Sequence, residues 1–232
     1  MAKLALVGYG KMGRMLDQLS PEFGLETVLR LDEFNNADGA GMTPEAFRDV
    51  EVAIEFSTPH SVIGNIEKLA KLGVATVVGT TGWVEQADHI AQVVAAGNIG
   101  LVWSPNFSVG VNVFTRLVSE AAKLLANEPS YGAWAWEIHH ITKKDAPSGT
   151  LVQLVKRMKE AGYERPIDVS SNRAGAHPGT HEIGFDSAAD TITLRHAARG
   201  REGFARGALK AAQWLVETKR KGFIEFTDVL FR

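Results

Sequence analysis

The sequence contains no cysteine, which excludes disulfides, thiolate nucleophiles, iron–sulfur clusters and cysteine-ligated zinc. Proline is scarce, with 8 in 232 residues, and 25 basic side chains are balanced by 27 acidic ones with no block of like charge. A nucleic-acid-binding surface is therefore not indicated. No apolar run approaches the roughly 20 residues that a bilayer span needs. From these absences we expect a protein that neither crosses a membrane nor binds nucleic acid.

What the sequence does contain is a large hydrophobic fraction, 45% of all residues, which is enough for a sizeable globular core. Its length lies between one and two typical domains. The first apolar run, residues 4–7, is interrupted by Gly8 and Gly10 before the apolar region of a signal peptide could form. We therefore expect a cytoplasmic protein.

The first 107 residues alternate short apolar segments with helical patterns. Strands are expected at 4–7, 27–31, 50–56, 74–78 and 101–103, with an amphipathic helix in most of the intervals. Parallel neighbouring strands require crossover connections of this kind. The pattern predicts an α/β fold with a Rossmann-like, doubly wound parallel sheet.

After residue 107 the rhythm changes to that of an inserted α+β domain. The expected elements are a helix of about 18 residues from Val109, a strand at 133–138, a helix at 148–161, a hairpin at 180–196, a last helix at 204–219 and a strand at 223–226. We assign residues 1–107 and 202–232 to a dinucleotide-binding domain, and 108–201 to a domain for substrate binding and oligomerisation.

A glycine loop follows the first strand. Residues 8–13 match the G-x-G-x-x-G pattern, and Asp32 stands 19 residues beyond Gly13, at the end of the second strand. The pattern predicts a dinucleotide site in preference to a glycine turn without ligand, with contacts from Gly8, Gly10, Lys11, Met12, Gly13 and Asp32. Asp32 would accept hydrogen bonds from a ribose 2′-hydroxyl and repel a 2′-phosphate, which favours NADH. Arg30 and Lys11 keep NADPH open.

Three polar loops, 57–59, 79–82 and 104–107, each follow a predicted strand. Taken singly, each is typical of an ordinary turn. Ligands of open α/β sheets lie beyond the carboxyl ends of the strands, so the three together predict a pocket for cofactor and substrate.

The densest polar stretch runs from Glu137 to Thr150. If the strand before it is regular, Trp134, Trp136 and Ile138 share one face, while Ala135, Glu137 and His139 share the other. We expect His139 on the less buried face and His140 on the tryptophan face.

The segment 145–150 reads as a capped helix start with proline in the first turn. Amide groups near Ser148, Gly149 and Thr150 would form an anion site at the positive end of the helix, and Lys143 adds a full positive charge. The predicted ligand is a small carboxylate or phosphate. The alternative is structural, with Asp145 capping the helix and Lys143 in solvent.

Two other chemistries fit poorly. His139 and His140 are adjacent on a strand and point apart, and the 177–181 segment is broken by proline and glycine, so no metal site is expected. Ser148 lacks a G-x-S-x-G environment, so a hydrolase triad is not indicated either.

These segments resemble the 4-hydroxy-tetrahydrodipicolinate reductase family. The likeness rests on E-x-H-H-x-x-K-x-D-A-P-S-G-T at 137–150, G-T-T-G at 79–82, N-F-S-V-G-V-N at 106–112, R-x-G at 173–175, His181, and the pattern from His196 to Ala208. The glycine loop is one residue shorter than in many members, Glu55 stands where many have aspartate, and the chain is shorter than many relatives.

The resemblance implies reduction of a cyclic dicarboxylate by NADH or NADPH, with loss of water, to give tetrahydrodipicolinate in the diaminopimelate and lysine pathway. His139 is implied as the proton donor and acceptor, and Lys143 as a second proton donor. The implied substrate ligands are His140, Gly149, Thr150 and Arg201, beside the helix start at Ser148. The nicotinamide end would be lined by Gly79, Thr80, Thr81, Ser104, Pro105, Asn106 and Phe107. Members of the family are usually homotetramers joined through the sheet of the inserted domain.

Two other classes stay open at this point. One is a non-catalytic dinucleotide sensor, which would not need His139 and Lys143 beside an anion site. The other is a dehydrogenase acting on a different small hydroxy or amino acid.

Overall fold

The computed structural model describes residues 1–231, and the chain forms two compact units, Met1–Val109 with Glu202–Arg232, and Gly110–Arg201. None of the helices in this range is both long and apolar enough to cross a membrane.

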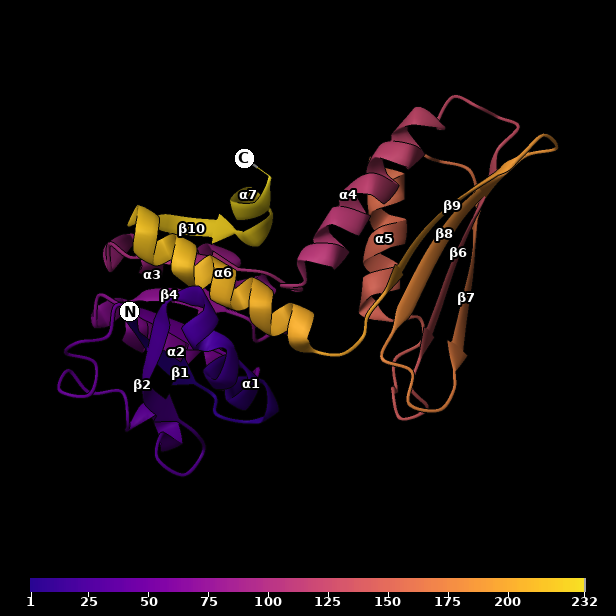
Figure 1. Cartoon of the computed structure of the whole chain (residues 1–232). Helices are drawn as coiled ribbons and strands as arrows, with labels where there is room; N and C mark the ends of the chain where they lie inside the picture. The colour runs from indigo at the N-terminus through magenta and orange to yellow at the C-terminus, as the bar shows by residue number, and fades with distance from the viewer. Residues whose placement is uncertain (232) are drawn as a thin grey trace. The chain divides into compact units, whose positions relative to one another are not determined.

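The first unit is built on one parallel sheet of six strands, in the order β10-β5-β4-β3-β1-β2 (Figure 1). Its strands are β1 (Ala2–Val7), β2 (Leu25–Leu31), β3 (Val52–Glu55), β4 (Ala75–Val78), β5 (Gly100–Trp103) and β10 (Gly222–Glu225). Its helices are α1 (Lys11–Leu19), α2 (Val62–Lys71), α3 (Ala87–Ala96), α6 (Glu202–Thr218) and α7 (Phe226–Leu230). The predicted doubly wound sheet is confirmed.

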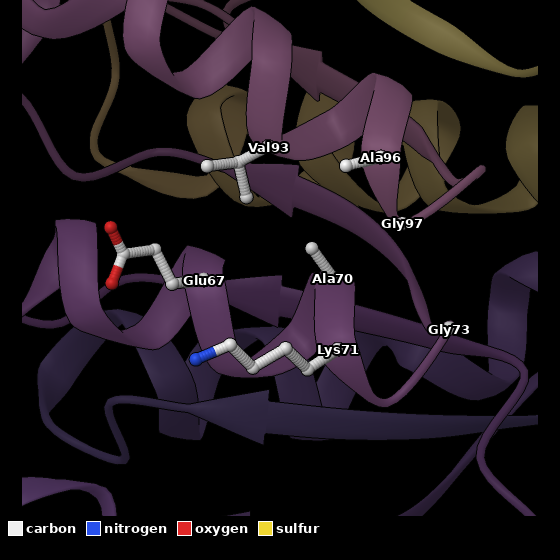
Figure 2. A pocket seen from close by; sticks show the side chains of 7 residues that line it. All are labelled: Glu67, Ala70, Lys71, Gly73, Val93, Ala96 and Gly97. Carbon is white, nitrogen blue, oxygen red and sulfur yellow. The ribbon is translucent and has the colours of Figure 1, made fainter.

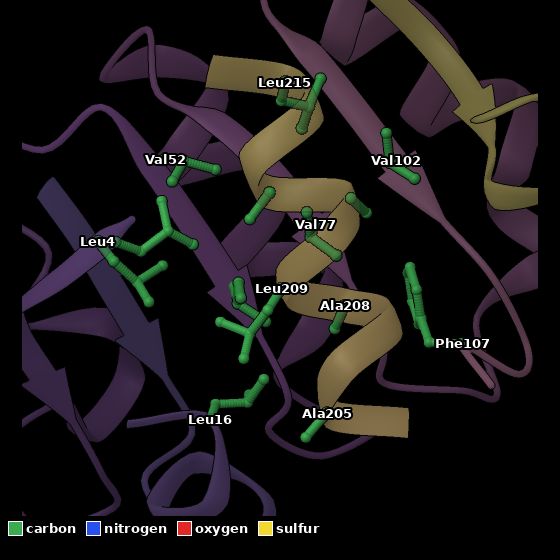
Figure 3. Close-up of a cluster of buried hydrophobic side chains, with 14 of the residues drawn as sticks. Leu4, Leu16, Val52, Val77, Val102, Phe107, Ala205, Ala208, Leu209 and Leu215 are labelled. Atoms are coloured by element: carbon green, nitrogen blue, oxygen red, sulfur yellow. The ribbon is translucent and has the colours of Figure 1, made fainter. Parts of the chain in front are cut away.

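Both faces of this sheet are covered by helices, because alternate residues of each strand point to opposite sides. Leu4 and Leu6 of β1 pack with α1 and α6, whereas Ala5 and Val7 pack on the side of α2. Figure 3 shows α6 crossing the strands, with its small and apolar side chains lying on Val52, Val77 and Val102. The central strands therefore read as short, mainly apolar runs in the sequence.

The strand order places a topological switch between β1 and β3. From β1 the chain passes outward to β2 on one side, and from β3 it passes to β4 and β5 on the other. In open α/β sheets this is where the crevice for a ligand forms. The glycine loop after β1 and the Ser57 segment after β3 lie at this point.

The second unit is a mixed sheet of four strands in the order β7-β6-β8-β9, with β6 and β7 parallel and the other pairs antiparallel. Its elements are β6 (Gly132–His139), β7 (Ile167–Arg173), β8 (Thr180–Asp186), β9 (Thr191–Ala197), α4 (Val109–Leu124) and α5 (Gly149–Glu160). Ala135, Ile183 and Phe185 pack against apolar side chains of α4 and α5. One face of the sheet is thereby covered by helices.

Two expectations for this unit were incomplete or wrong. Strand β7 was not predicted, because its sequence IDVSSNR is polar and it lies at the edge of the sheet. The expected faces of β6 were reversed: Ala135, Glu137 and His139 are buried, whereas Trp134 and Trp136 are only partly covered. Small residues on the first face let the helices approach closely, so the helices cover that face and not the one with the large side chains.

Candidate active site

The glycine loop has a geometry that only glycine allows at two of its three positions. Gly8 has φ +102°, and a Cβ there would lie 2.1 Å from the carbonyl oxygen of Phe56. A Cβ on Gly13 would lie 2.4 Å from the carbonyl oxygen of Gly8. Around Gly10 no atom lies within 4 Å of such a Cβ, so the backbone there faces open space. This cradle fits the pyrophosphate of a dinucleotide.

Helix α1 begins at Lys11 without a side-chain cap, with Gly10 as its N-cap residue. The amides of its first turn are therefore available to an anion, and the helix dipole favours one there. Lys11 is exposed and Met12 half-buried at this helix start. Both lie where the sequence predicted contacts with the cofactor.

The loop after β2 is ordered around Asp32. Its Oδ1 accepts hydrogen bonds from the amides of Phe34 (2.9 Å) and Asn35 (3.1 Å), and its own amide donates to Asn35 Oδ1. The carboxylate is thus fixed at the end of β2, where a ribose is expected.

Arg30, two residues before Asp32, forms an ion pair with Asp17. Its guanidinium makes two hydrogen bonds to the Asp17 carboxylate, at 2.7 and 2.8 Å, and Tyr9 donates to the same carboxylate. Arg30 therefore holds the pKa of Asp17 below its usual value. Of the two cations that kept NADPH open in the sequence, Arg30 is neutralised by an acid of helix α1, whereas Lys11 is exposed at the helix start.

The loops after β3 and β4 are joined by hydrogen bonds. The amide of Ser57 donates to Thr80 Oγ1 at 2.8 Å, and Trp83 Nε1 donates to the carbonyl of Thr80 at 2.7 Å. Gly79 is packed so closely on the ring of Phe56 that a Cβ would lie 2.0 Å from it. Thr81 is exposed at the tip of this loop.

The segment after β5 is held by its own polar groups. Ser104 Oγ donates to the carbonyl of Asn106 at 2.8 Å, and the amide of Ser108 donates to Asn106 Oδ1. Pro105 is exposed, whereas Phe107 is buried in the core, 4.9 Å from the ring of Phe226. Any contact of Phe107 with a cofactor therefore comes from its backbone.

In the second unit, Glu137 and His139 form the centre of a buried polar cluster. His139 Nδ1 is hydrogen-bonded to one oxygen of Glu137, and Arg173 Nη2 lies 2.9 Å from the other. Gly179 closes over the ring, since a Cβ there would lie 2.8 Å from His139 Nε2. The pair orients the imidazole with Nδ1 toward the carboxylate and Nε2 on the opposite side.

Ser148 connects this cluster to the start of α5. Its amide donates to Glu137 at 3.2 Å, its hydroxyl accepts from the amide of Leu151 as the helix N-cap, and its Oγ lies 3.0 Å from His181 Nε2. The N-cap is thus Ser148, not Asp145, and Pro147 precedes the helix instead of lying in its first turn. The amide and hydroxyl of Ser148 are already used within the protein.

The remaining predicted residues lie in the loop before this helix, in its first turn and, for Arg201, after β9. Lys143 Nζ is 2.8 Å from Asp145 Oδ1, so it is not simply solvated, and Asp145 is exposed. His140, which follows the end of β6, has Nδ1 2.7 Å from the hydroxyl of Thr142. Gly149 is exposed, and a Cβ added to it would have no atom within 4 Å. Thr150 is half-buried in the first turn. Arg201 is exposed after β9.

The cluster sets the protonation of its members. Burial alone raises the pKa of Glu137, but Arg173 and its other partners hold that pKa below its usual value, so Glu137 is ionised. Burial lowers the pKa of His139 despite the opposing effect of Glu137. Burial lowers the pKa of His181 to about 4, which keeps it neutral at physiological pH.

Glu137, His139 and His181 also have ligand atoms within 4.8 Å of one another, as a metal site would need. Both Glu137 oxygens, His139 Nδ1 and His181 Nε2 are, however, already hydrogen-bonded within the protein. A cation would also have to displace the Arg173 guanidinium from Glu137. The arrangement fits proton transfer better than metal binding.

An open groove of about 530 Å³ lies between α2 and α3 (Figure 2). It is lined by Glu67, Ala70, Lys71, Gly73, Val93, Ala96 and Gly97. Gly73 and Gly97 precede β4 and β5, so this groove lies at the amino ends of the strands. The glycine loop and the loops after β3, β4 and β5 lie at the other end of the same strands, their carboxyl ends.

Sequence reasoning assigned no role to three members of the buried cluster, Glu137, Arg173 and His181. Each of the three lies in a segment on which the family resemblance rests, and that resemblance is the sequence signal that could have pointed to them. Their convergence depends on strand β7 and on the pairing of β6 with β8, which local patterns do not define.

Family models describe both halves of the chain. Residues 2–107 match "Dihydrodipicolinate reductase, N-terminus" and residues 110–230 match "Dihydrodipicolinate reductase, C-terminus". A 4-hydroxy-tetrahydrodipicolinate reductase of Christiangramia forsetii is 32% identical over 98% of this chain and 97% of its own. Another, from Methanoregula boonei, is 32% identical over 99% and 98%.

A solved structure, titled as a dipicolinate-bound dihydrodipicolinate reductase from Paenisporosarcina sp. TG-14, has the same fold. Its TM-score is 0.82 at 22% identity, covering 99% of this chain and all of that one. With matches to both family models and to full-length relatives, the chain belongs to the dihydrodipicolinate reductase family, whose members are NAD(P)H-dependent oxidoreductases.

Proposed function

We propose that this chain reduces the cyclic dicarboxylate of its family to tetrahydrodipicolinate, as a 4-hydroxy-tetrahydrodipicolinate reductase, with His139 and Lys143 as its catalytic residues. Unit Met1–Val109 with Glu202–Arg232 binds the dinucleotide, and unit Gly110–Arg201 binds the substrate. The observation that carries the proposal is the buried Glu137–His139 pair beneath the start of α5.

The dinucleotide is held by this chain's own glycine cradle and by Asp32. Gly10 lets the backbone approach the phosphates, the first turn of α1 supplies amides, and Asp32 accepts from a ribose hydroxyl. When bound, the reduced nicotinamide supplies a hydride. Asp32, with Arg30 neutralised by Asp17, favours NADH over NADPH.

His139 exchanges a proton at Nε2. Glu137 is ionised and accepts from Nδ1, so the proton on Nδ1 is fixed and Nε2 is the atom left to give or take one. Lys143 supplies a second proton or a positive charge as negative charge develops on the substrate. Asp145 holds the Lys143 ammonium in place.

The substrate carboxylates bind at the start of α5 and beside the neighbouring cations. Gly149 has no side chain to obstruct them, and the helix dipole favours an anion there. His140, Thr150 and Arg201 complete the set, with Ser148 shaping the turn. The structural neighbour whose title names bound dipicolinate, a planar dicarboxylate, supports a ligand of this shape.

We also propose a homotetramer in the cytoplasm, joined through the face of the four-stranded sheet that α4 and α5 leave uncovered. Trp134, Trp136 and Ile138 lie on that face and are only partly buried. Light scattering should give about four times the 25.1 kDa mass of one chain. A mass of one chain at micromolar concentration would contradict this assembly.

A coupled assay tests the reaction directly. Substrate is generated freshly in the cuvette, and NADH oxidation is followed by its absorbance. We expect oxidation that depends on both substrate and enzyme. A dinucleotide sensor would bind NADH without turnover, and a different dehydrogenase would oxidise or reduce hydroxy or amino acids in preference to this substrate.

A further inference from the structure

A second buried acid lies in the first unit, away from the His139 cluster. Glu55 is the last residue of β3, at the switch point of the sheet, and its side chain is completely buried. Its strand neighbours are Val7 of β1 and Val78 of β4, and its carbonyl accepts from the amide of Gly79. It therefore lies directly below the loops that follow β3 and β4.

The carboxyl group is bonded on one oxygen only. Oε1 accepts from the Ser57 hydroxyl and from Asn65 Nδ2 at 3.1 Å. Asn65 Nδ2 also donates to Ser57 Oγ at 3.2 Å. The amide of Ser57 in turn donates to Thr80 Oγ1. Oε2 is buried and has no hydrogen-bond partner among the described residues.

This pattern fits a protonated acid. Two donors on Oε1 make it the acceptor, which leaves Oε2 to carry the proton. An ionised carboxylate would instead leave a buried charged oxygen without a donor, at a far higher cost than an unpaired hydroxyl. Burial raises the pKa of Glu55 more than the nearby donors of Ser57, Thr80 and Asn65 lower it, which agrees with this geometry.

We propose that Glu55 is a positioning residue of the dinucleotide site: an uncharged buried acid that joins the loop after β3 to the loop after β4 and so sets their fit to the cofactor. The proposal rests on the proposed function and on the expectation that the loops after β3 and β4, at the carboxyl ends of their strands, line the pocket of the dinucleotide. Glu55 itself does not touch the cofactor, because its side chain is covered by the protein. It acts through Ser57 and Thr80.

Two uncharged variants separate this role from simple core filling. Glu55→Gln keeps an acceptor for Ser57 and Asn65 and carries no charge, so its NADH Kd should stay within about threefold of wild type. Glu55→Leu fills a similar volume without an acceptor, and its NADH Kd should rise about tenfold, the scale of losing a hydrogen bond that leaves donors unpaired. Dipicolinate affinity should change little in both. Glu51→Gln, at an exposed position just before the same strand, is the matched control.

Infrared difference spectra of wild type against Glu55→Gln at neutral pH give a direct readout. We expect the C=O band of a protonated carboxylic acid that the variant lacks. Absence of that band, a large loss of NADH affinity in Glu55→Gln, or unchanged affinity in a folded Glu55→Leu would overturn the proposal. Failure of the wild type to bind any dinucleotide would instead overturn the proposed function, and the assignment of Glu55 with it.

Discussion

Arg173, which is partly buried, forms an ion pair with the fully buried Glu137 on the adjacent parallel strand, with Arg173 Nη2 2.9 Å from Glu137 Oε1. The pair keeps Glu137 charged, and the second oxygen of Glu137 meets His139 Nδ1. A histidine oriented in this way exposes one defined nitrogen for proton transfer. The orientation of the proposed catalytic residue thus depends on a strand at the edge of the sheet.

Removing the charge of Glu137 should lower the turnover number and shift the pH dependence of turnover. In Glu137→Gln, His139 loses the anion that raises its pKa, so the limb on which activity falls with loss of the His139 proton should move to lower pH. The turnover number should fall by about 10²-fold. Steady-state kinetics across pH measure both effects. The control is Glu182→Gln, whose carboxylate pairs with Arg195, and it should keep the wild-type profile.

His181 should make the protein less stable in acid. Its folded pKa is about 4, below the value of about 6.5 for an unfolded histidine, so the unfolded chain takes up the proton first as pH falls. Stability should decrease between about pH 6.5 and 4, by on the order of 3 kcal/mol for this residue alone. Urea midpoints measured at several pH values should fall less steeply in His181→Gln. Identical slopes in wild type and His181→Gln would show that His181 does not titrate in this way.

Dinucleotide preference should depend on Asp32 and Asp17. Calorimetry should show NADH binding at least as well as NADPH in the wild type. Asp32→Ala removes the negative charge facing a 2′-phosphate, and Asp17→Asn releases Arg30, so each should raise NADPH affinity, by about tenfold for a change of roughly 1.4 kcal/mol. The control Asp49→Ala changes an exposed ion pair with Lys3. A wild-type preference for NADPH that survives Asp32→Ala would contradict the placement of Asp32.

Gly149 offers a test of the anion site that does not disturb the fold. No atom lies within 4 Å of a Cβ at this position, so Gly149→Val should fold normally, yet its side chain would obstruct a carboxylate at the helix start. The Kd for 2,6-pyridinedicarboxylate and the KM for substrate should rise about tenfold, the scale of one lost charge-assisted hydrogen bond. Gly64→Ala, on α2 and equally unobstructed, is the control. Unchanged kinetics in Gly149→Val would move the anion site elsewhere.

The parallel sheet could be predicted because its central strands are buried on both faces and the helices between the strands have clear apolar stripes. The glycine loop was recognisable because Gly8 and Gly13 satisfy steric limits that no other residue meets. Strand β7 could not be predicted, since its residues are polar and its pairing with β6 is a long-range contact.

The same limit explains the error at β6. Large tryptophans suggested the buried face, but the helices pack where Ala135 leaves room. Burial of Glu137 is tolerated because Arg173 and Ser148 satisfy it, and neither is close to it in sequence. The sequence offered His139 and Lys143 as candidates, while the groups that orient His139 become evident only once the strands are paired.

The most direct test of the account is the turnover of His139→Gln and Lys143→Ala on freshly generated substrate, with NADH affinity measured on the same samples. His60→Gln and Lys144→Ala, both at exposed positions, are the matched controls. We predict that each catalytic variant loses about 10²-fold or more in turnover number at unchanged NADH Kd, and that the double variant loses much less than the product of the two. Near-normal turnover in either single variant would contradict its catalytic role, and losses confined to KM would reduce both residues to substrate binding.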